Sequence, residues 1–437
     1  MKVKHIIYTL IFIVSSIPLF ALSGYWEKMR PELNGDIPSP RFKYYAAPID
    51  ERKVLLFNGM GSPTNDTWIY DYDMDKWTKI QCDSFPDTYR VYPNTLPVAK
   101  IDNKNVLTIG ECVLEERKSY HTYWLFNYDS LNWYMLLVDT FIRPSNLAYI
   151  SDGLIMNYHD YRLLGKIIYS TWLLNIELKE PITNTIITQT KILDETANGN
   201  YGPGIKNDID FFSGNYDFDY LNETKPILFV PPMDRLSTIG NLFFVYLDTS
   251  DWKWKNIERY DKTTTFLERN WHRNLTNNVI IAHYHSDRVT YDDHFQFLYY
   301  DTITNTMKIE NMEMLNEFPI EYDKSYCHRK MIKIKDKAVM VLAGDYEKSE
   351  TWVFHLTDTV DLIDADTKEE GHLFYVGNNN YFLTNIENAE LYDIMGNLFG
   401  IFYDNSVIDL NRYTVGTYLI RYTDLNKKNR TTKIIKQ

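Results

Sequence analysis

The residues of this sequence whose spacing comes nearest to a metal site are His283 and His285, which are separated by one residue. Residues i and i+2 of a strand lie on one face, so the two imidazoles could bind one ion, with His272 or His294 as a third ligand. The alternative is a polar strand end, at which the imidazoles hydrogen-bond to nearby backbone. No Cys or Glu stands at ligand spacing beside this pair, so we predict neither a metal nor any other cofactor.

Polar residues also recur at the ends of successive strand-like segments. In a unit of four antiparallel strands, the connection between the second and third strands emerges on the same side as the connection to the next unit. Both connections should therefore contribute to one ligand-binding face, composed of His159, Asp160, Arg162, Asp234, Arg235, His272, His283, His285, Asp287 and Arg329. An arginine at a first strand, such as Arg41, could bind a carboxylate bidentately, although such arginines more often join neighbouring units.

A repeated segment must position this face. Asn65–Ile80 reads as a strand with Trp68, a turn, and a strand with Trp77, and related segments recur at intervals of roughly fifty residues. Two more strand-like runs lie upstream of each segment, so each repeat supplies four strands. One residue marks the turn of each repeat: Asp73, Asp129, Glu177, Asp248, Asp301 and Thr357. The pattern predicts an all-β fold, a six-bladed β-propeller with four-stranded blades, in which Trp77, Trp133 and Trp254 pack between blades.

The sixth repeat lacks a fourth strand, and a matching strand is found near the N-terminus. Tyr25–Met29 aligns with Lys76–Ile80, the fourth strand of the first repeat. A ring closed by its first strand leaves no open sheet edge, so we predict that this strand completes the last blade. Within the fifth repeat, Met312–Phe318 is expected to form one short helix.

Residues 24–358 resemble the kelch family of propellers. The matching features are the sequence PSPR at 38–41, a glycine that closes the second strand, and the half-repeat of Trp, Tyr-Asp and Trp; the glycines are Gly59, Gly110 and Gly344. The paired glycines of that family are absent, and NYHD, VPPM and HYHS replace them in repeats three to five. The resemblance implies a propeller that binds ligands at its loop face.

The N-terminus has the pattern of a signal peptide. A basic start precedes the apolar run Ile6–Phe20, and small residues follow at Ala21 and Ser23. We therefore expect residues 1–23 to be removed on export, which leaves a mature chain without a membrane span. The net charge of −13 makes nucleic acid and anionic membranes poor partners.

The chain has three cysteines, Cys82, Cys112 and Cys327. In an exported protein an odd number leaves at least one free thiol or an intermolecular bridge. Cys82 and Cys112 follow strands of adjacent repeats on the same side, so a bridge between them is an alternative.

The last part of the chain, residues 359–437, has a different organisation. Acidic residues are frequent between Asp358 and Glu370, and short strand-like runs then follow closely on one another. No tryptophan recurs among them. The pattern predicts a small, Ig-like β-sandwich.

This tail resembles the C-terminal sorting (Por) domain of type IX secretion cargo. Four segments carry the resemblance in order: Leu391–Gly396, Ile408–Leu410, Gly416–Ile420 and Lys433–Lys436. The residues carried over are Tyr392, Asp393, Gly396, Gly416, Tyr418, Lys433 and Lys436. The usual Asn-Pro pair near the start is missing. The resemblance implies recognition by type IX machinery, passage across a Gram-negative outer membrane, and removal of the tail. The alternative is a passive sandwich that binds or spaces.

The expected function is that of a secreted or outer-surface-attached protein that binds an extracellular glycan or protein. The alternative is an exported enzyme that acts on polysaccharide or peptide at the channel mouth. The motif Gly-x-Ser-x-Gly is absent, and a pair of acids for glycoside hydrolysis has no recognisable position in the sequence. We therefore predict no catalytic residue, and binding is the favoured class.

Overall fold

The structure is a computed structural model. It describes residues 23–42, 44–61, 65–86, 98–113, 119–136, 146–163, 166–194, 217–220, 226–230, 243–250, 252–259, 271–276, 278–285, 293–310, 313–316, 328–344, 349–357, 361–364, 372–425 and 427–436. The expected signal peptide lies outside these residues, apart from Ser23. Among the described residues no helix has the length and apolar character needed to span a membrane.

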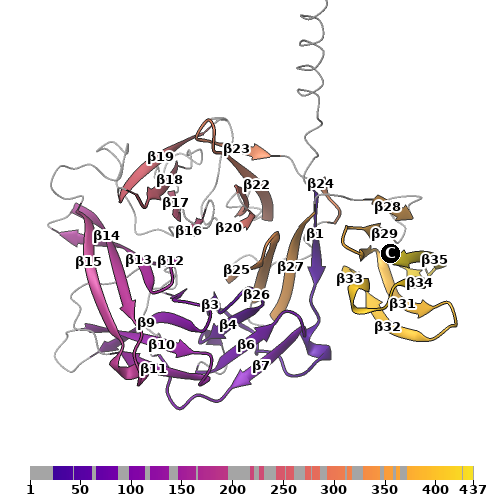
Figure 1. Ribbon diagram of the computed structural model, residues 1–437, viewed down its shortest axis with the longest axis horizontal. Helices are drawn as coiled ribbons and strands as arrows, with labels where there is room; N and C mark the ends of the chain where they lie inside the picture. Colours follow the sequence, from indigo (N-terminus) through magenta and orange to yellow (C-terminus); the bar gives the residue numbers. More distant parts are fainter. Residues whose placement is uncertain are drawn as a thin grey trace, which may run out of the picture. The chain divides into compact units, whose positions relative to one another are not determined.

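The chain divides into two compact units (Figure 1). The larger unit contains Met29–Glu310 and Ile320–Phe354, and the smaller contains Met1–Lys28, Asn311–Pro319 and His355–Gln437. Both are built from β-strands; the described helices are three 3-10 turns, η1 (Pro31–Leu33), η2 (Ile182–Asn184) and η3 (Leu410–Arg412). The prediction of an all-β fold is therefore confirmed.

The first three predicted repeats each form one antiparallel sheet of four strands in chain order. The first sheet contains β3 (Tyr45–Pro48), β4 (Lys53–Phe57), β6 (Thr67–Asp71) and β7 (Lys76–Ile80). A two-stranded ribbon of β2 (Arg41–Phe42) and β5 (Met60–Gly61) accompanies it. The second contains β8 (Val98–Lys100), β9 (Asn105–Val113), β10 (Ser119–Asn127) and β11 (Asn132–Leu136). The third contains β12 (Asn146–Ser151), β13 (Leu154–Leu163), β14 (Lys166–Glu177) and β15 (Ile186–Asp194).

The fourth and fifth repeats join into one sheet. The fourth supplies β16 (Asp217–Tyr220), β17 (Pro226–Val230), β18 (Phe243–Asp248) and β19 (Lys253–Arg259). The fifth supplies β20 (Trp271–Thr276), β21 (Val279–His285), β22 (Asp293–Asp301) and β23 (Thr306–Glu310). A short parallel pairing, Glu258 with Thr306 and Arg259 with Met307, connects the fourth strands of the two repeats. Within each repeat the strands are antiparallel, as the sequence predicted.

The sixth repeat contributes β25 (His328–Lys335), β26 (Ala338–Gly344) and β27 (Ser349–Thr357). Its sheet has the order β24-β1-β27-β26-β25, where β1 is Ser23–Lys28 and β24 is Glu313–Met314. The expected helix at 312–318 is therefore wrong at Glu313 and Met314. These residues pair in parallel with Ser23 and Gly24, because the edge of β1 offers backbone hydrogen-bonding groups to an extended segment.

The turn that marks the repeats has a common structure. The third strand ends in Asp71, Asn127, Asp248 or Asp301, and each of these residues pairs with the first residue of the fourth strand. Its side-chain oxygen accepts a hydrogen bond from a backbone N–H two or three residues later, at 2.9–3.0 Å for the nearest N–H. The residue before the fourth strand has a positive φ in each case: Asp75, Leu131, Trp252 and Asn305. In these four repeats the period in the sequence is thus the period of a side-chain-capped hairpin turn, whereas in the third repeat β14 ends at Glu177 and the 3-10 turn η2 follows.

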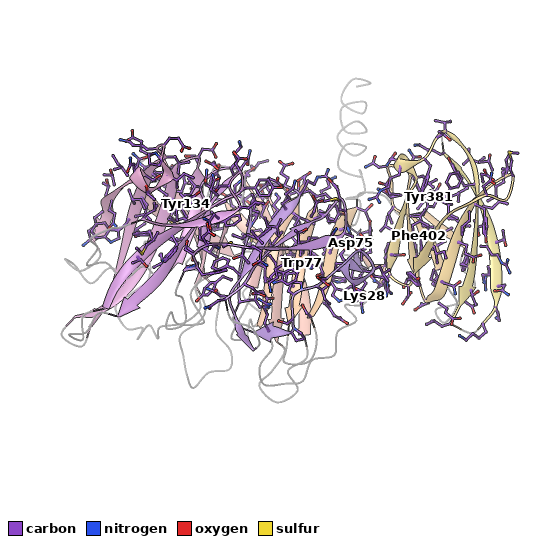
Figure 2. The ribbon with its side chains drawn as sticks, turned by 90° about the horizontal axis from the view of Figure 1, so that it is seen from below. Lys28, Asp75, Trp77, Tyr134, Tyr381 and Phe402 are labelled. Atoms are coloured by element: carbon purple, nitrogen blue, oxygen red, sulfur yellow. The ribbon has the colours of Figure 1, made fainter. Side chains whose placement is uncertain are left out.

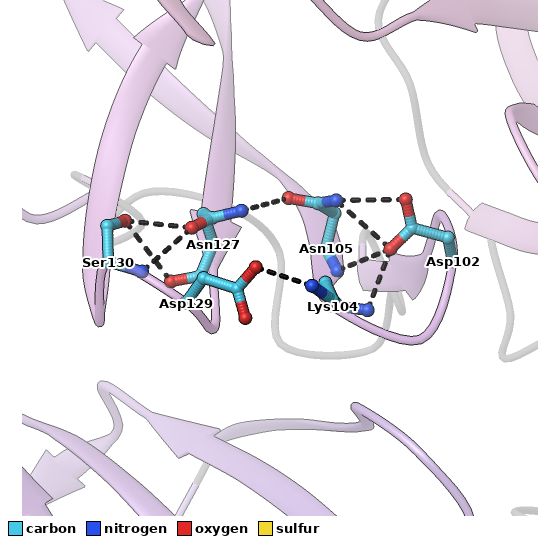
Figure 3. Close-up of polar contacts among 6 residues, drawn as sticks. All are labelled: Asp102, Lys104, Asn105, Asn127, Asp129 and Ser130. Carbon is cyan, nitrogen blue, oxygen red and sulfur yellow. Dashed lines mark hydrogen bonds and ion pairs between the residues drawn. The ribbon is translucent and has the colours of Figure 1, made fainter.

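The second repeat extends this turn into a wider polar network (Figure 3). The Asn127 amide donates to Asn105 Oδ1 at 2.9 Å, and the Asn105 amide donates to both carboxylate oxygens of Asp102. Lys104 pairs with Asp129 at 2.6 Å, although both side chains are more than half exposed. The network joins the two hairpin turns at this end of the sheet and satisfies their polar groups.

The repeated tryptophans pack between neighbouring sheets. Trp133 of β11 is 1% exposed, and its indole N–H donates to Thr67 of the first sheet at 3.0 Å. Trp77 shares a core with Ile332 and Met340 of the sixth repeat. The predicted packing role is confirmed for both residues. The side chain of Trp254 lies outside the described residues, so its packing stays a prediction.

The first strands of the repeats contact one another in sequence. Among the described strands of the larger unit, β3 contacts β8, β8 contacts β12, β12 contacts β16, β16 contacts β20, and β20 contacts β25. Strand β25 in turn contacts β3, so the series returns to its start. Hydrophobic clusters between consecutive sheets accompany these contacts. The core of the larger unit therefore lies between sheets rather than within any one of them.

Candidate functional site

The tail folds into two sheets that share one core. The first sheet has the order β28-β29-β30-β33, with bounds Asp361–Asp364, His372–Tyr375, Asn380–Thr384 and Ser406–Asp409. The second has the order β32-β31-β34-β35, with bounds Leu398–Tyr403, Ile386–Asp393, Gly416–Asp424 and Asn429–Lys436. Buried side chains of both sheets, such as Leu383, Tyr381 and Ile420, belong to one cluster, and Phe402 packs against it. Tyr381 and Phe402 are labelled in Figure 2. The two sheets therefore form a sandwich.

The segments that resemble a sorting signal gather mainly on the second sheet. Leu391–Gly396 ends β31 and forms the following turn, Gly416–Ile420 begins β34, and Lys433–Lys436 ends β35. These three are neighbours, because β31 pairs with β34 and β34 with β35. The remaining segment, Ile408–Leu410, lies at the end of β33 in the first sheet, where Ile408 and Leu410 are buried.

Asp393 holds the turn after β31 in place. Its Oδ1 accepts hydrogen bonds from the backbone N–H groups of Met395 and Asn397, both at 2.8 Å, and its Oδ2 accepts from the Asn397 amide at 2.7 Å. These bonds, the Asn397 side chain first, lower the pKa of Asp393. Gly396 has φ +85°, and an added Cβ would meet no atom within 4 Å. The glycine is therefore required by the backbone conformation and not by lack of space.

The two tyrosines of the motif have opposite environments. Tyr418 is 3% exposed, and its hydroxyl donates to the Thr414 carbonyl at 2.5 Å. Tyr392 lies on the outer side of β31, where its hydroxyl donates to Glu390 at 2.6 Å. That hydrogen bond raises the pKa of Tyr392. Tyr418 thus belongs to the core, whereas Tyr392 is partly exposed on the outer face.

The two lysines of the motif also differ. Lys436 donates from Nζ to the Tyr413 carbonyl at 2.6 Å and so fixes the end of β35. Lys433 is exposed and pairs in the ladder with Leu419, which pairs in turn with Tyr392. Lys433, Leu419 and Tyr392 therefore lie in one row across the outer face of the sheet.

Apolar residues of this outer face are exposed to an unusual degree. Leu398 is 50%, Ile401 52% and Ile435 55% exposed, and the neighbouring turn carries Met395 at 83%. Outward positions of a strand with one buried face are usually polar, but Leu398, Ile401 and Ile435 are apolar. An apolar residue at an outward position is the one signal by which the sequence could have identified them. These exposed apolar residues lie on both edge strands of the sheet, β32 and β35.

The predicted ligand-binding residues are placed only as strand positions. His159, Asp160 and Arg162 lie within β13, which continues with β14 as a long hairpin up to the pair Leu163–Lys166. His272 lies in β20, and Arg329 in β25. Asp234, Arg235 and Asp287 lie outside the described residues. The proposed common face and its role in binding stay a prediction.

The strand register bears on the alternative of a histidine metal site. His283 and His285 lie in β21, at alternate positions that belong to the same face of the strand. The register pairs His272 with Ala282, and His294 with Tyr284. His272 and His294 therefore occupy positions of the opposite face of the sheet. Three-histidine ligation by this set would need a change of register. In the part of the chain that the structure describes, no group of three metal-ligating residues comes together.

Arg41 is a structural residue and not part of an open face. Its side chain is 3% exposed and forms a two-point ion pair with Asp66, one contact being Nη2 to Oδ2 at 2.9 Å. It also donates to the Asn58 carbonyl, and Asp66 accepts from the indole of Trp68 at 2.7 Å. Arg41 therefore bonds within its own repeat, and not to a neighbouring unit as such arginines more often do.

Cys82 is a free thiol. Its Sγ lies 3.6 Å from the carbonyl oxygen of Leu131, and burial raises the pKa of the thiol. The alternative of a bridge between Cys82 and Cys112 is therefore wrong. The side chains of Cys112 and Cys327 lie outside the described residues.

No protein-family model and no curated protein matches the chain. Among solved structures, the β-propeller domain of the Trilobed protease from Pyrococcus furiosus is 12% identical with a TM-score of 0.34, over 78% of this chain and 95% of that one. A protein of unknown function from Dyadobacter fermentans is 9% identical with a TM-score of 0.42, over 77% and 98%. A subtype N11 neuraminidase-like protein of A/flat-faced bat/Peru is 10% identical with a TM-score of 0.39, over 78% and 95%.

Proposed function

We propose that this protein is a secreted or cell-surface binding protein in which residues 24–358 form a kelch-like, six-bladed propeller. Residues 359–437 are its C-terminal sorting domain, which directs export through a type IX secretion system after removal of the signal peptide. Its ligand is an extracellular glycan or protein. The alternative is an exported enzyme that acts on polysaccharide or peptide at the channel mouth, but no described group of side chains favours it.

The ring of contacts among first strands supports the propeller. Six four-strand units whose first strands contact in a series that returns to β3 have the arrangement of blades around a central axis. The sheet order, in which β1 is adjacent to β27, supports a last blade completed by the N-terminal strand. A ring closed in this way has its loop face available for binding, since the hydrophobic contacts lie between blades.

One observation carries the sorting proposal. Segments that are far apart in the sequence meet on one sheet, and three of their residues form an outward row, Tyr392, Leu419 and Lys433. A passive sandwich that served only as a spacer would need the inward residues of these segments, such as Tyr418, to fold. It would not need the outward residues. The outward row is the part of the motif that a receptor could read.

The sorting proposal is tested by substitutions on the outer face of the full chain. In a Gram-negative host with type IX machinery, Lys433→Ala and Tyr392→Ala should accumulate as folded protein in the periplasm. Lys427→Ala is the matched control, because Lys427 is also exposed but pairs with Glu387 at 2.7 Å. Surface protein should lack the tail by mass spectrometry. Normal export of both variants, or surface protein that retains residues up to Lys436, would contradict the proposal.

The binding class is tested separately. Glycan and peptide arrays read for both retention and turnover distinguish a binding protein from an enzyme. His285→Ala and Arg329→Ala should weaken retention without changing the melting temperature. If both lower stability instead, they are structural residues, and turnover without retention would favour the enzyme.

A further inference from the structure

The N-terminal strand β1 is buried against the C-terminal sandwich, within the smaller unit. Tyr25 is 5% exposed, and its ring stacks on His355 at 4.9 Å between centroids and packs on Phe382 of β30 at 4.4 Å. Val376 belongs to the same cluster, as do the partly buried Phe374 and Val407. The outer surface of the first sheet of the sandwich is therefore covered by a segment of its own chain from the other end of the sequence.

Two asparagines bind the backbone of the same strand, Asn316 through its side chain and Asn405 through its carbonyl. Asn316 accepts from the N–H of Trp26 at 2.8 Å and donates to the Trp26 carbonyl at 2.9 Å. The same amide donates to Asn405 Oδ1 at 2.8 Å. The Asn405 carbonyl in turn accepts from the N–H of Lys28 at 2.7 Å. Backbone hydrogen bonds from an inserted strand position it independently of its side chains, and Tyr25 adds a specific anchor.

Asn405 is shaped for this contact. It has φ +54° in the turn between β32 and β33, a conformation that asparagine adopts more readily than most residues. Thr384 donates to its Oδ1 at 3.2 Å, and the Asn405 amide donates to Asp404 at 3.1 Å. Close by, Glu27 forms a contact of 2.8 Å with His355. Hydrogen bonds within the sandwich therefore hold the turn that binds β1.

We propose that the sandwich is a clamp for the mature N-terminal strand. Residues 24–28 occupy the surface formed by Phe382, Val407 and Asn405, and they fold together with the tail as one unit. The clamp rests on contacts within the smaller unit and does not depend on the proposed function.

The clamp is tested by cutting the folded chain. A specific protease site inserted between Thr357 and Asp361 of the chain 24–437 separates the tail covalently after folding. The two fragments should still elute together in size-exclusion chromatography. With Tyr25→Ala and Asn405→Gly combined they should separate, since glycine keeps the positive φ and removes only the side chain. Asn429→Ala, an exposed residue of β35, is the control and should leave the fragments together.

A second measurement covers the case in which the double variant folds poorly. In the uncut chain, hydrogen exchange at the amides of Trp26 and Lys28 should be faster in Asn316→Ala than in the native sequence. The amides of β4 should exchange at an unchanged rate. Fragments of native sequence that separate on cutting while the sandwich keeps its circular dichroism would overturn the clamp. Neither measurement uses export. A failed sorting experiment therefore does not count against the clamp, and a failed clamp experiment does not count against the sorting proposal.

Discussion

The repeated sheets of the larger unit and the second sheet of the sandwich use their motif residues in opposite ways. In the repeats, the tryptophans and the residues that cap turns face the protein itself: Trp133 is buried, and Asp301 binds the N–H groups of its own turn. In the sandwich, Asp393 caps a turn by the same chemistry, but that turn presents the exposed side chains of Ile394 and Met395. Packing explains why the buried and turn-capping residues of the repeats recur. The fold does not require the exposed side chains of the sandwich motif, so these need another explanation.

The largest effect is expected where a repeated residue is removed from the core. Trp133→Ala should lower the free energy of unfolding by about 3–5 kcal/mol, because a large cavity forms between two sheets and the bond to Thr67 is lost. Chemical denaturation of the full chain measures this change. Lys433→Ala, the outward residue of the sandwich, is the comparison and should leave stability unchanged. A comparable loss for Lys433 would break the distinction between inward and outward motifs.

A buried ion pair should cost nearly as much when one partner is removed. Arg41→Ala leaves the carboxylate of Asp66 buried without its guanidinium, and such a change destabilises proteins by about 3–5 kcal/mol. The exposed pair of Arg52 and Asp73 provides the contrast, because side-chain exposures of 46% and 58% allow water to replace it. Arg52→Ala should therefore have little effect in the same denaturation experiment. Equal effects would mean that burial does not separate the two pairs.

These two regions also differ in how well the sequence predicted them. The repeat was visible because four of the described hairpin turns carry a capping Asp or Asn and indoles pack between neighbouring sheets, so residues such as Asp71 and Trp77 recur at one spacing. The packing of β1 on the sandwich was not predictable, whereas its place in the sheet of the sixth repeat was. Tyr25 and Asn405 are separated by nearly the whole chain, and neither residue type signals such a contact. The same limit applies to Glu313 and Met314, where a local pattern suggested a helix but the open edge of β1 selects a strand.

Within the sandwich, substitutions of the two motif tyrosines should differ in their effect on stability, by a smaller amount than in the two comparisons above. Tyr418→Phe removes the hydrogen bond that the hydroxyl of the buried Tyr418 donates to the Thr414 carbonyl, at a cost of about 1 kcal/mol. Tyr392→Phe removes a bond on the outer face, where water can replace it, so stability should not change. Thermal melts of both variants measure the difference. If Tyr392→Phe is the more destabilising, the outer face is part of the fold and not a surface kept for a partner.

The smallest effect concerns the capped turns and pH. Hydrogen bonds from Thr304, and from the backbone N–H groups of Ile303 and Thr304, lower the pKa of Asp301 to about 2. A carboxylate with a lowered pKa stabilises the fold above its ordinary pKa, and this contribution is lost as the pH falls through the lowered value. Asp301→Asn keeps an oxygen for the turn, as Asn127 does in the second repeat, but it does not titrate. The native protein should therefore melt at a higher temperature than the variant at pH 6, and the difference should shrink as the pH is lowered through the range from the ordinary value of 3.8 to about 2. A difference that stays constant over this range would mean that the turn is held by its backbone geometry alone, and the aspartate would then be a marker of the repeat without a charge-dependent role.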